Sequence, residues 1–167
     1  NSDRSVDWGF NLGRIALNDG LTCGGLVVDE DGNVYISGSF RSLVDFDPLG
    51  NEMILTSEGG RDAFLAKYHD ISGSLTFDWV RHFGGTLGSG TNTANESQAI
   101  TIDNAGGIYI TGNFRGASAD FSYANVSLLC QGGCNLATTT TIAGRTNSFI
   151  AKFQNNGPHD GECLWAY

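Results

Sequence analysis

The chain has 167 residues, enough for one domain with a buried core that does not require cross-links to be stable. Its 18 acidic and 9 basic residues give a net charge of −9, and the basic residues stand singly, which excludes a nucleic-acid partner that requires a clustered basic surface. No apolar stretch is long enough for a membrane span, and the first ten residues lack the basic flank and apolar run of a signal peptide.

Four strands are predicted between residues 23 and 96, at 25–29, 33–40, 62–69 and 75–83. Each run is rich in β-branched and aromatic residues and either alternates with polar residues or is continuously apolar. The Asp-Gly pair before residue 33 is a strong signal for a hairpin between the first two strands. The stretch DFDPLGNEMILTS joins the second and third strands as a long loop or an extra hairpin. No segment has the period and caps of a helix, so little or no helix is expected.

Residues 97–167 repeat this pattern. The stretch LVVDEDGNVYISGSFR, from Leu26, aligns with ITIDNAGGIYITGNFR, from Ile100, and AFLAKY aligns with SFIAKF further along. Trp79 and Trp165 occupy the same place in the two copies, and an insertion around CQGGCNLATTTT lengthens the second copy. Self-similarity at a fixed period is typical of repeat architectures. We therefore expect an N-terminal strand and linker at 1–22, a first repeat at 23–96 and a second repeat at 97–167, together forming one structural unit.

Four antiparallel strands per repeat are typical of a β-propeller blade with long connections. The elements DEDGNVYISGSF, VDFDP, GGRDAFLAKY and WVRHFGG, with the weaker copies DNAGGIYITGNF, ADFS, GRTNSFIAKF and LWAY, resemble the SBBP repeat. This is a family of propeller repeats found mostly in large secreted or surface proteins. The resemblance implies an all-β fold of two tandem four-stranded antiparallel blades and an extracellular or cell-surface location. It implies no activity and supplies no catalytic residues.

Four cysteines form two groups. Cys130 and Cys134 lie in CQGGC, whose glycines permit a tight turn. A local disulfide is therefore favoured there over a metal site, because no histidine stands nearby at ligand spacing. Cys23 and Cys163 are left to pair with each other or with another chain, and their positions in the sequence do not decide between these alternatives.

Two N-glycosylation tripeptides, NES at Asn95 and NVS at Asn125, agree with an extracellular setting. Such tripeptides also occur by chance, so they add little to the prediction of a glycoprotein.

Asp29, Asp31 and Asn33 alternate around a glycine, as in the first half of a calcium loop. The twelfth position, where a bidentate glutamate is expected, holds Phe40, and the second copy, DNAGG, lacks two of the oxygen ligands. Because Asp, Asn and Gly also favour tight turns, turn formation explains both copies. We expect no cofactor, with calcium as the weaker alternative.

Other polar residues recur once per repeat. The repeated positions are Asp45, Asp47 and Asp120, and Lys67 and Lys152. A catalytic site seldom occurs once per repeat, whereas a repeated aspartate commonly caps a turn or accepts backbone donors. We therefore predict that the chain is not an enzyme.

Two blades do not close a propeller, which needs about four to eight, so apolar faces and edge strands are expected to be exposed. Trp8 and Phe10 lie in a front strand that resembles the fourth strand of a repeat, and Trp165 and Tyr167 lie in a shortened fourth strand at the end. We expect strand addition between these ends, which would build a ring or a fibre, unless the chain is part of a longer propeller.

The sequence thus predicts a non-catalytic extracellular structural or assembly protein, such as the subunit of a fibre or surface layer, whose partner is a copy of itself. The alternative is a carbohydrate-binding or adhesion module of a larger secreted propeller protein, with glycans stacked on exposed aromatic rings.

Overall fold

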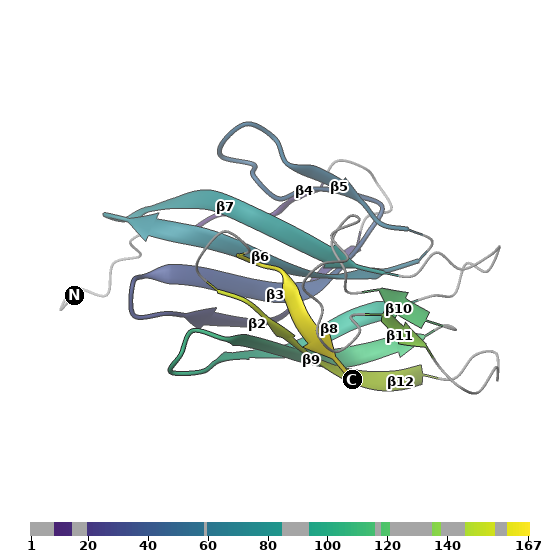
Figure 1. Cartoon of the computed structure of the whole chain (residues 1–167). Coiled ribbons are helices and arrows are strands. Elements are labelled where there is room, and N and C mark those ends of the chain that lie inside the picture. The colour runs from purple at the N-terminus through teal and green to yellow at the C-terminus, as the bar shows by residue number, and fades with distance from the viewer. Residues whose placement is uncertain are drawn as a thin grey trace.

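The computed structural model describes residues 9–14, 20–58, 60–84, 94–115, 118–120, 135–137, 146–155 and 160–167. Within these ranges all regular structure is β, with no helix, as the sequence predicts (Figure 1). The described part of the chain accordingly has no helix that could span a membrane.

The first sheet contains the four strands predicted for the first repeat. They are β2 (Gly20–Val28), β3 (Asn33–Arg41), β6 (Asp62–Ile71) and β7 (Ser74–Phe83), antiparallel and in that order. Strand β2 begins earlier than predicted and continues through a bulge between Cys23 and Gly25. The turns after β2 and β6 place Gly32 and Gly73 at φ angles of 82° and 81°, which only glycine adopts at little cost.

The second sheet repeats this arrangement with β8 (Asn95–Ile102), β9 (Ile108–Arg115), β12 (Thr146–Phe153) and β13 (Cys163–Ala166). Its two turns also use positive-φ glycines, Gly106 at 83° and Gly161 at 79°. The repeat in the sequence is therefore a repeat of four-stranded antiparallel sheets. Both sheets are open, with β7 and β13 at corresponding edges.

Two small sheets complete the fold. Strands β1 (Gly13–Arg14), β4 (Leu43–Asp45) and β5 (Ile54–Thr56) form one, in the order β1-β4-β5. The stretch between β3 and β6 is therefore an extra hairpin. Strands β10 (Ser118–Asp120) and β11 (Asn135–Ala137) pair within the second repeat.

Each four-stranded sheet has two faces with different side chains. We call the face of the first sheet that carries Tyr35, Leu65, Lys67 and Trp79 its tyrosine face, and the opposite face, which carries Ile36, its isoleucine face. In the second sheet the tyrosine face carries the equivalent residues Tyr109, Ile150, Lys152 and Trp165, and the isoleucine face carries Ile110.

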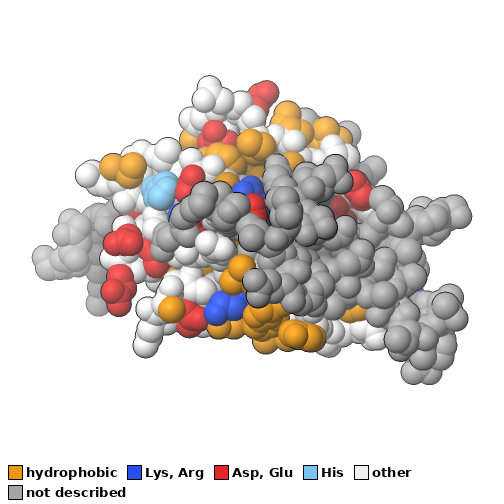
Figure 2. Space-filling model, viewed as in Figure 1, with side chains coloured by type: hydrophobic (Ala, Val, Ile, Leu, Met, Phe, Trp, Pro, Cys, Tyr) orange, Lys and Arg blue, Asp and Glu red, His pale blue; other side chains and the backbone are white. Residues whose placement is uncertain are grey.

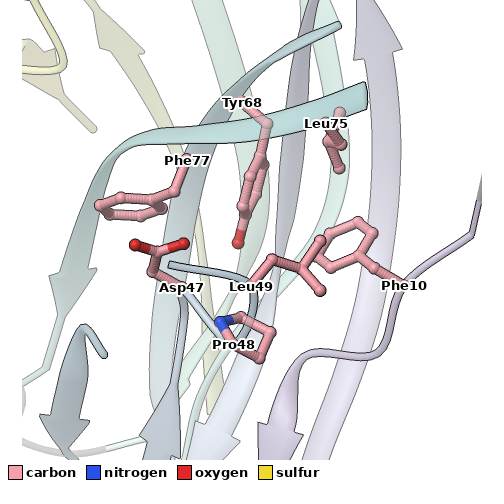
Figure 3. A pocket seen from close by; sticks show the side chains of 7 residues that line it. All are labelled: Phe10, Asp47, Pro48, Leu49, Tyr68, Leu75 and Phe77. Atoms are coloured by element: carbon pink, nitrogen blue, oxygen red, sulfur yellow. The ribbon is translucent and has the colours of Figure 1, made fainter. Parts of the chain in front are cut away.

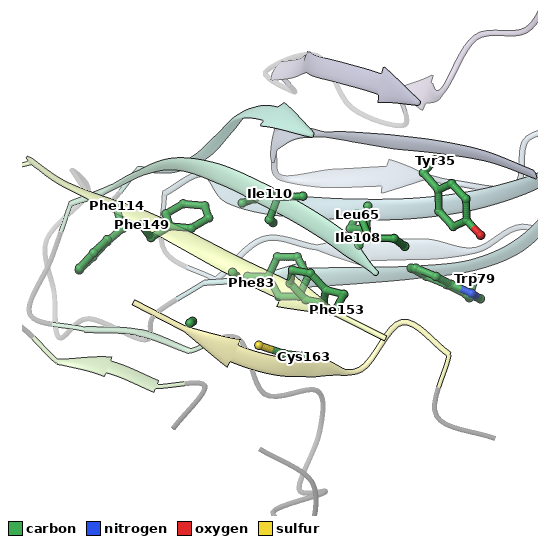
Figure 4. Packing of buried hydrophobic residues seen from close by; sticks show 13 residues of the cluster. Tyr35, Leu65, Trp79, Phe83, Ile108, Ile110, Phe114, Phe149, Phe153 and Cys163 are labelled. Atoms are coloured by element: carbon green, nitrogen blue, oxygen red, sulfur yellow. The ribbon is translucent and has the colours of Figure 1, made fainter. Parts of the chain in front are cut away.

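The two sheets stack with unlike faces in contact, as Figure 4 shows. The tyrosine face of the first sheet packs against the isoleucine face of the second in one core cluster. Its members from the two sheets are Tyr35, Ala63, Leu65, Trp79, Phe83, Ile108, Ile110, Phe114, Phe149, Ala151, Phe153, Cys163 and Ala166.

A second core cluster covers most of the isoleucine face of the first sheet. Val44 and Phe46, from the β4–β5 hairpin, pack there against Phe40 and Phe64, with partly buried Phe10 at the margin. The first sheet is thus the middle layer, with the small β1-β4-β5 sheet on one side and the second sheet on the other (Figure 1).

Candidate assembly surface

The contact between the stacked sheets is anchored by the turn between β12 and β13. Gly161 lies flat against the Trp79 ring, because a Cβ atom built on it would come within 3.0 Å of three ring carbons. Beside it, the Lys67 ammonium donates to the Asp160 carboxylate at 2.7 Å. The Tyr35 hydroxyl oxygen lies 2.6 Å from the Asn155 side-chain oxygen. The tyrosine face of the first sheet is therefore contacted by a turn that contains a glycine and polar side chains.

A second polar contact strengthens this anchor. The Arg81 guanidinium donates to the backbone oxygen of Asp160 at 3.1 Å and lies over the Trp79 ring at 5.1 Å. A cation over an indole ring is favourable, and more so where the pair is partly desolvated. Lys67, Trp79 and Arg81 thus hold one turn of the second sheet from three neighbouring positions.

In both sheets the tyrosine is oriented by an aspartate in the preceding turn. The Tyr35 hydroxyl donates to Asp29 at 3.0 Å, and the Tyr109 hydroxyl donates to Asp103 at 2.9 Å. Burial and the nearby Asp29 charge raise the pKa of Tyr35, so the phenol stays protonated at neutral pH and can donate.

The two aspartates themselves are held ionised. Backbone donation from Gly107 and the hydroxyl of Tyr109 lower the pKa of Asp103 from 3.8 to about 2. At Asp29, desolvation acts to raise the pKa, but hydrogen bonds from Asn33, Tyr35 and Asp31 outweigh it, so the net pKa is lowered.

In the second sheet the same tyrosine face meets solvent. Ile150 is 45% exposed, whereas its equivalent Leu65 is 0% exposed, and Tyr167 at the end of the face is 71% exposed. Trp165 is half-buried and packs on Tyr109 with ring centroids 6.0 Å apart. In the lower part of Figure 2, over the second sheet, hydrophobic side chains gather beside basic and acidic ones. This surface has the residue types of a stacking face and no sheet stacked on it in the described structure.

Lys152 stands at the position of Lys67, but in the described structure no turn is docked on it. Its ammonium donates to the Tyr109 hydroxyl at 2.7 Å and to Asp103 at 3.3 Å, within its own sheet. The hydrogen bond from Lys152 to Tyr109 is the first cause of the raised pKa of Lys152. Tyr109, Lys152 and Asp103 therefore form a polar group at the margin of the exposed tyrosine face.

The calcium candidates Asp29, Asp31 and Asn33 lie in the turn between β2 and β3. One Asp29 oxygen accepts the backbone N–H groups of Asp31 at 3.0 Å and Asn33 at 2.8 Å, and the other accepts the Asn33 side chain at 2.7 Å. The carboxylate is thus directed to its own turn. The described residues contain no group of three or more His, Cys, Asp or Glu side chains arranged to hold a metal ion.

Asp45 and Asp47 accept backbone donors, as the repeat pattern predicts. Asp45 accepts from the N–H groups of Asp47 at 2.9 Å and Met53 at 2.8 Å, and Asp47 accepts from Asn51 at 3.0 Å. These carboxylates organise the connection between β4 and β5. The side chain of Asp120 lies outside the described residues.

Cys23 and Cys163 form no disulfide in the structure. Cys23 is exposed on β2, whereas Cys163 is buried in the cluster between the sheets. The alternative that pairs them within the chain is therefore not realised, and burial keeps the Cys163 thiol from the surface of a neighbouring chain. Cys130 and Cys134 lie outside the described residues.

The glycosylation candidate Asn95 opens β8 at the contact between the sheets. It is 4% exposed, and both its backbone and side-chain N–H groups point to the Arg61 carbonyl, at 2.9 and 3.4 Å. A glycan on this side chain would have to displace that contact, so the fold argues against modification of Asn95. Asn125 lies outside the described residues.

The N-terminal segment lies against its own chain where it is described. β1 pairs with β4, and Phe10 packs on Tyr68 with ring centroids 5.2 Å apart. Figure 3 shows Phe10 and Leu49 beside Tyr68 around a hollow about the size of a water molecule. This differs from the expected strand beside a fourth strand, because apolar side chains of the segment find cover on the isoleucine face of the first sheet. Trp8 lies outside the described residues.

At the other end, Trp165 and Tyr167 lie where the sequence predicts a short fourth strand. β13 pairs with β12, and Tyr167 exchanges backbone hydrogen bonds with Ile150 at 2.8 and 2.9 Å. Both side chains belong to the exposed tyrosine face.

Sequence reasoning missed the residues that fill the contact: Asn155, Asp160 and Gly161. The Asp-Gly pair in HDGE is the same hairpin signal that marked the turn before β3, so it could have been found. Its contact with Trp79 could not, because it depends on how the two repeats stack.

Comparisons of the chain with protein-family models, with curated proteins and with solved structures give no match.

Proposed function

We propose that this chain is a non-catalytic structural protein of the extracellular space or cell surface, built from propeller-like blades and assembling with copies of itself. The observation that carries the proposal is the unequal fate of the two tyrosine faces. One is buried between sheets, and its equivalent in the second sheet exposes Ile150 and Tyr167 and leaves Trp165 partly buried. A contiguous exposed apolar patch rimmed by polar groups commonly marks an interaction site.

The roles of the repeated polar residues support a structural function. Asp29 and Asp103 organise turns, and Lys67 holds the turn of the next sheet. The two aspartates serve the same purpose in each repeat, as parts of a stacking unit require. The extracellular location rests on the resemblance to the SBBP repeat, and an open series of stacked units would give a fibre, whereas a closing rotation would give a ring.

Sedimentation velocity of the purified chain over a wide range of concentrations tests the proposal. We expect the weight-average mass to rise with concentration, and electron microscopy of the concentrated sample should show rings or fibres. A single monomeric species up to millimolar concentration would overturn the proposal.

A carbohydrate-binding or adhesion module is the second candidate function. Trp165, Tyr109 and Tyr167 lie together on the exposed tyrosine face beside Lys152, an arrangement of rings and polar groups suited to sugar stacking. A glycan-array screen, followed by titration of tryptophan fluorescence with any bound glycan, distinguishes this function. Binding that is lost in Trp165→Ala would favour the module, and an array without signal would leave assembly as the function.

A further inference from the structure

We propose that the β4–β5 hairpin (residues 43–56) of one copy of this chain docks on the exposed tyrosine face of a second copy, with Glu52 opposite Lys152. The inference rests on the proposed assembly function and names the surface that the exposed tyrosine face binds. The contact joins two faces rather than the edge strands expected from the sequence. It uses the side of the hairpin that points away from the first sheet, so the covered isoleucine face takes no part.

The outward side of this hairpin is apolar. Its inward side packs on the isoleucine face through Val44 and Leu55, which are paired across the two strands. Because neighbouring residues of a strand point to opposite faces, Leu43 and Ile54 lie on the outward side. An exposed apolar group of this kind commonly marks an interaction site. Among the large apolar side chains that the described residues expose, the hairpin supplies more than any other element: Leu43, Leu49, Met53 and Ile54.

The hairpin carries carboxylates and no cation. Residues 42–60 contain four acidic residues and no lysine or arginine. Asp45 and Asp47 accept backbone donors inside the hairpin, whereas Glu52 is exposed at its tip, next to Met53. Two such hairpins repel each other, so the surface that complements this one is apolar and carries a cation.

The backbone at Glu52 is strained. Its φ angle is 55°, in the left-handed region that glycine adopts at little cost and glutamate does not. Strain at an exposed turn, where glycine would fit, is consistent with a function of the side chain itself. We expect that function to be the carboxylate that the tip presents to a neighbouring copy.

The exposed tyrosine face has the matching features. Ile150 and Tyr167 are its exposed apolar side chains. The Lys152 ammonium has three N–H donors, of which the Tyr109 hydroxyl and the Asp103 carboxylate take two. The third donor can therefore bind a carboxylate from outside its own sheet.

The equivalent lysine of the first sheet already binds two carboxylates in this way. The Lys67 ammonium lies 3.4 Å from Asp78 of its own sheet and 2.7 Å from Asp160 of the sheet stacked on its face. A lysine at this position of the repeat thus binds one carboxylate of its own sheet and one of the next layer. For Lys152 the next layer is the hairpin of a second copy, which supplies Glu52.

The two surfaces lie at opposite ends of the stack. Because the first sheet is the middle layer, the outward side of the hairpin and the exposed tyrosine face are the two outermost faces and point away from each other (Figure 1). One chain therefore cannot join its own two surfaces, and a second copy supplies each missing half. The contact is heterologous, so the series continues until the rotation between copies closes it.

Two charge variants test the contact: Glu52→Lys on the hairpin and Lys152→Glu on the exposed tyrosine face. Glu30→Lys, the same change at an exposed residue in the turn between β2 and β3, is the control. Each of the first two should weaken self-association by about tenfold or more, because like charges then meet in the contact, and the control should not. Sedimentation velocity measures the effect, and circular dichroism checks that each variant is folded.

Mixing the two variants gives the decisive result. An equimolar mixture should recover assembly, because every contact between unlike chains then joins opposite charges. The double variant, with both charges exchanged in one chain, should recover assembly for the same reason. If Lys152→Glu unfolds the chain, Ile150→Glu takes its place, since it puts a carboxylate on the same face and leaves the Lys152 contacts intact.

Glu52→Gly separates the carboxylate from the turn. Glycine adopts a φ of 55° without strain, so the urea midpoint of the monomer should rise while self-association weakens. A raised midpoint with unchanged self-association would overturn the role of Glu52 in the contact.

The remaining outcomes distinguish this inference from the proposed function. Wild-type assembly that neither charge variant weakens overturns the docking contact and leaves self-assembly standing. Weakening by Lys152→Glu without weakening by Glu52→Lys overturns the hairpin as the surface that the tyrosine face binds. A wild-type chain that stays monomeric overturns both the inference and the proposed function.

Discussion

Two sheets with the same sequence pattern differ in which of their faces is buried. Leu65 is packed in the core between the sheets, whereas Ile150 at the same position of the second repeat meets solvent. The isoleucine faces show the reverse on their edge strands. Leu26 and Val28 on β2 are exposed, whereas Ile100 and Ile102 on β8 are packed. Burial in this fold therefore follows a sheet's place in the stack rather than its residues.

The comparison also shows which features belong to a single repeat. The turn bonds around Asp29 are reproduced around Asp103, with two backbone donors and the tyrosine hydroxyl in each case. These local features do not depend on a neighbouring sheet. The contacts of Trp79 and Lys67 with the next turn do, so matched substitutions in the two repeats separate the two kinds of contribution.

Replacement of the two equivalent tryptophans should give the largest difference. Trp79→Ala removes a buried ring that packs on Gly161, Tyr35 and Arg81, and we expect a loss of about 3–5 kcal/mol in the free energy of unfolding. Trp165→Ala should cost less in the monomer, because its side chain is less buried than that of Trp79. Urea unfolding at low protein concentration measures both, and equal losses would mean that the second tyrosine face is covered in solution.

The sequence was sufficient for what each repeat does alone. Alternating apolar residues and the Asp-Gly turn predicted β3 and β6 closely, and the repeat alignment placed β9 and β12. The sequence did not predict how the sheets stack, because Tyr35 and Tyr109 are identical residues in similar strands and yet only one is fully buried. The same reason explains why the NES tripeptide could mark Asn95 as a glycosylation candidate without revealing that it lies at the contact between the sheets.

Two glycines with nearly the same backbone conformation separate turn strain from the stacking contact. Gly73→Ala should cost about 1–2 kcal/mol, because an alanine at positive φ is strained but meets no neighbour. Gly161→Ala bears the same strain and also drives its Cβ into the Trp79 ring, so we expect about 2–4 kcal/mol. The measurement is again urea unfolding, and Gly161→Ala in a Trp79→Ala background should lose the excess. An excess that survives there would place its cause elsewhere than in the ring.

The two repeated lysines should differ less, but in the same direction. Lys67→Met removes a nearly buried ammonium from Asp160 and leaves that carboxylate without its closest cation, at an expected cost of about 1–3 kcal/mol. Lys152→Met removes a more exposed ammonium whose partners, Tyr109 and Asp103, keep each other, so its thermal midpoint should equal that of the wild type. A large loss in Lys152→Met would show that the polar group on the exposed face is needed for folding of the second sheet.

The smallest expected effect concerns the aspartate turn that occurs once in each sheet, at Asp29 and at Asp103. The pKa of Asp103 is lowered from 3.8 to about 2, so its contribution to stability is complete above the unfolded pKa and is lost as the pH falls through about 2. Asp29 has a lowered pKa for the same reason, the donors of its own turn, and should lose its contribution in the same direction. NMR titration of the carboxyl carbons would show both aspartates titrating below the ordinary aspartate value of 3.8. Asp103→Asn should flatten the decline in stability below pH 4 without affecting the Asp29 titration, since the turns are independent. A titration of Asp103 near 3.8 would instead mean that the bonds from Gly107 and Tyr109 form only when another sheet is stacked on this face.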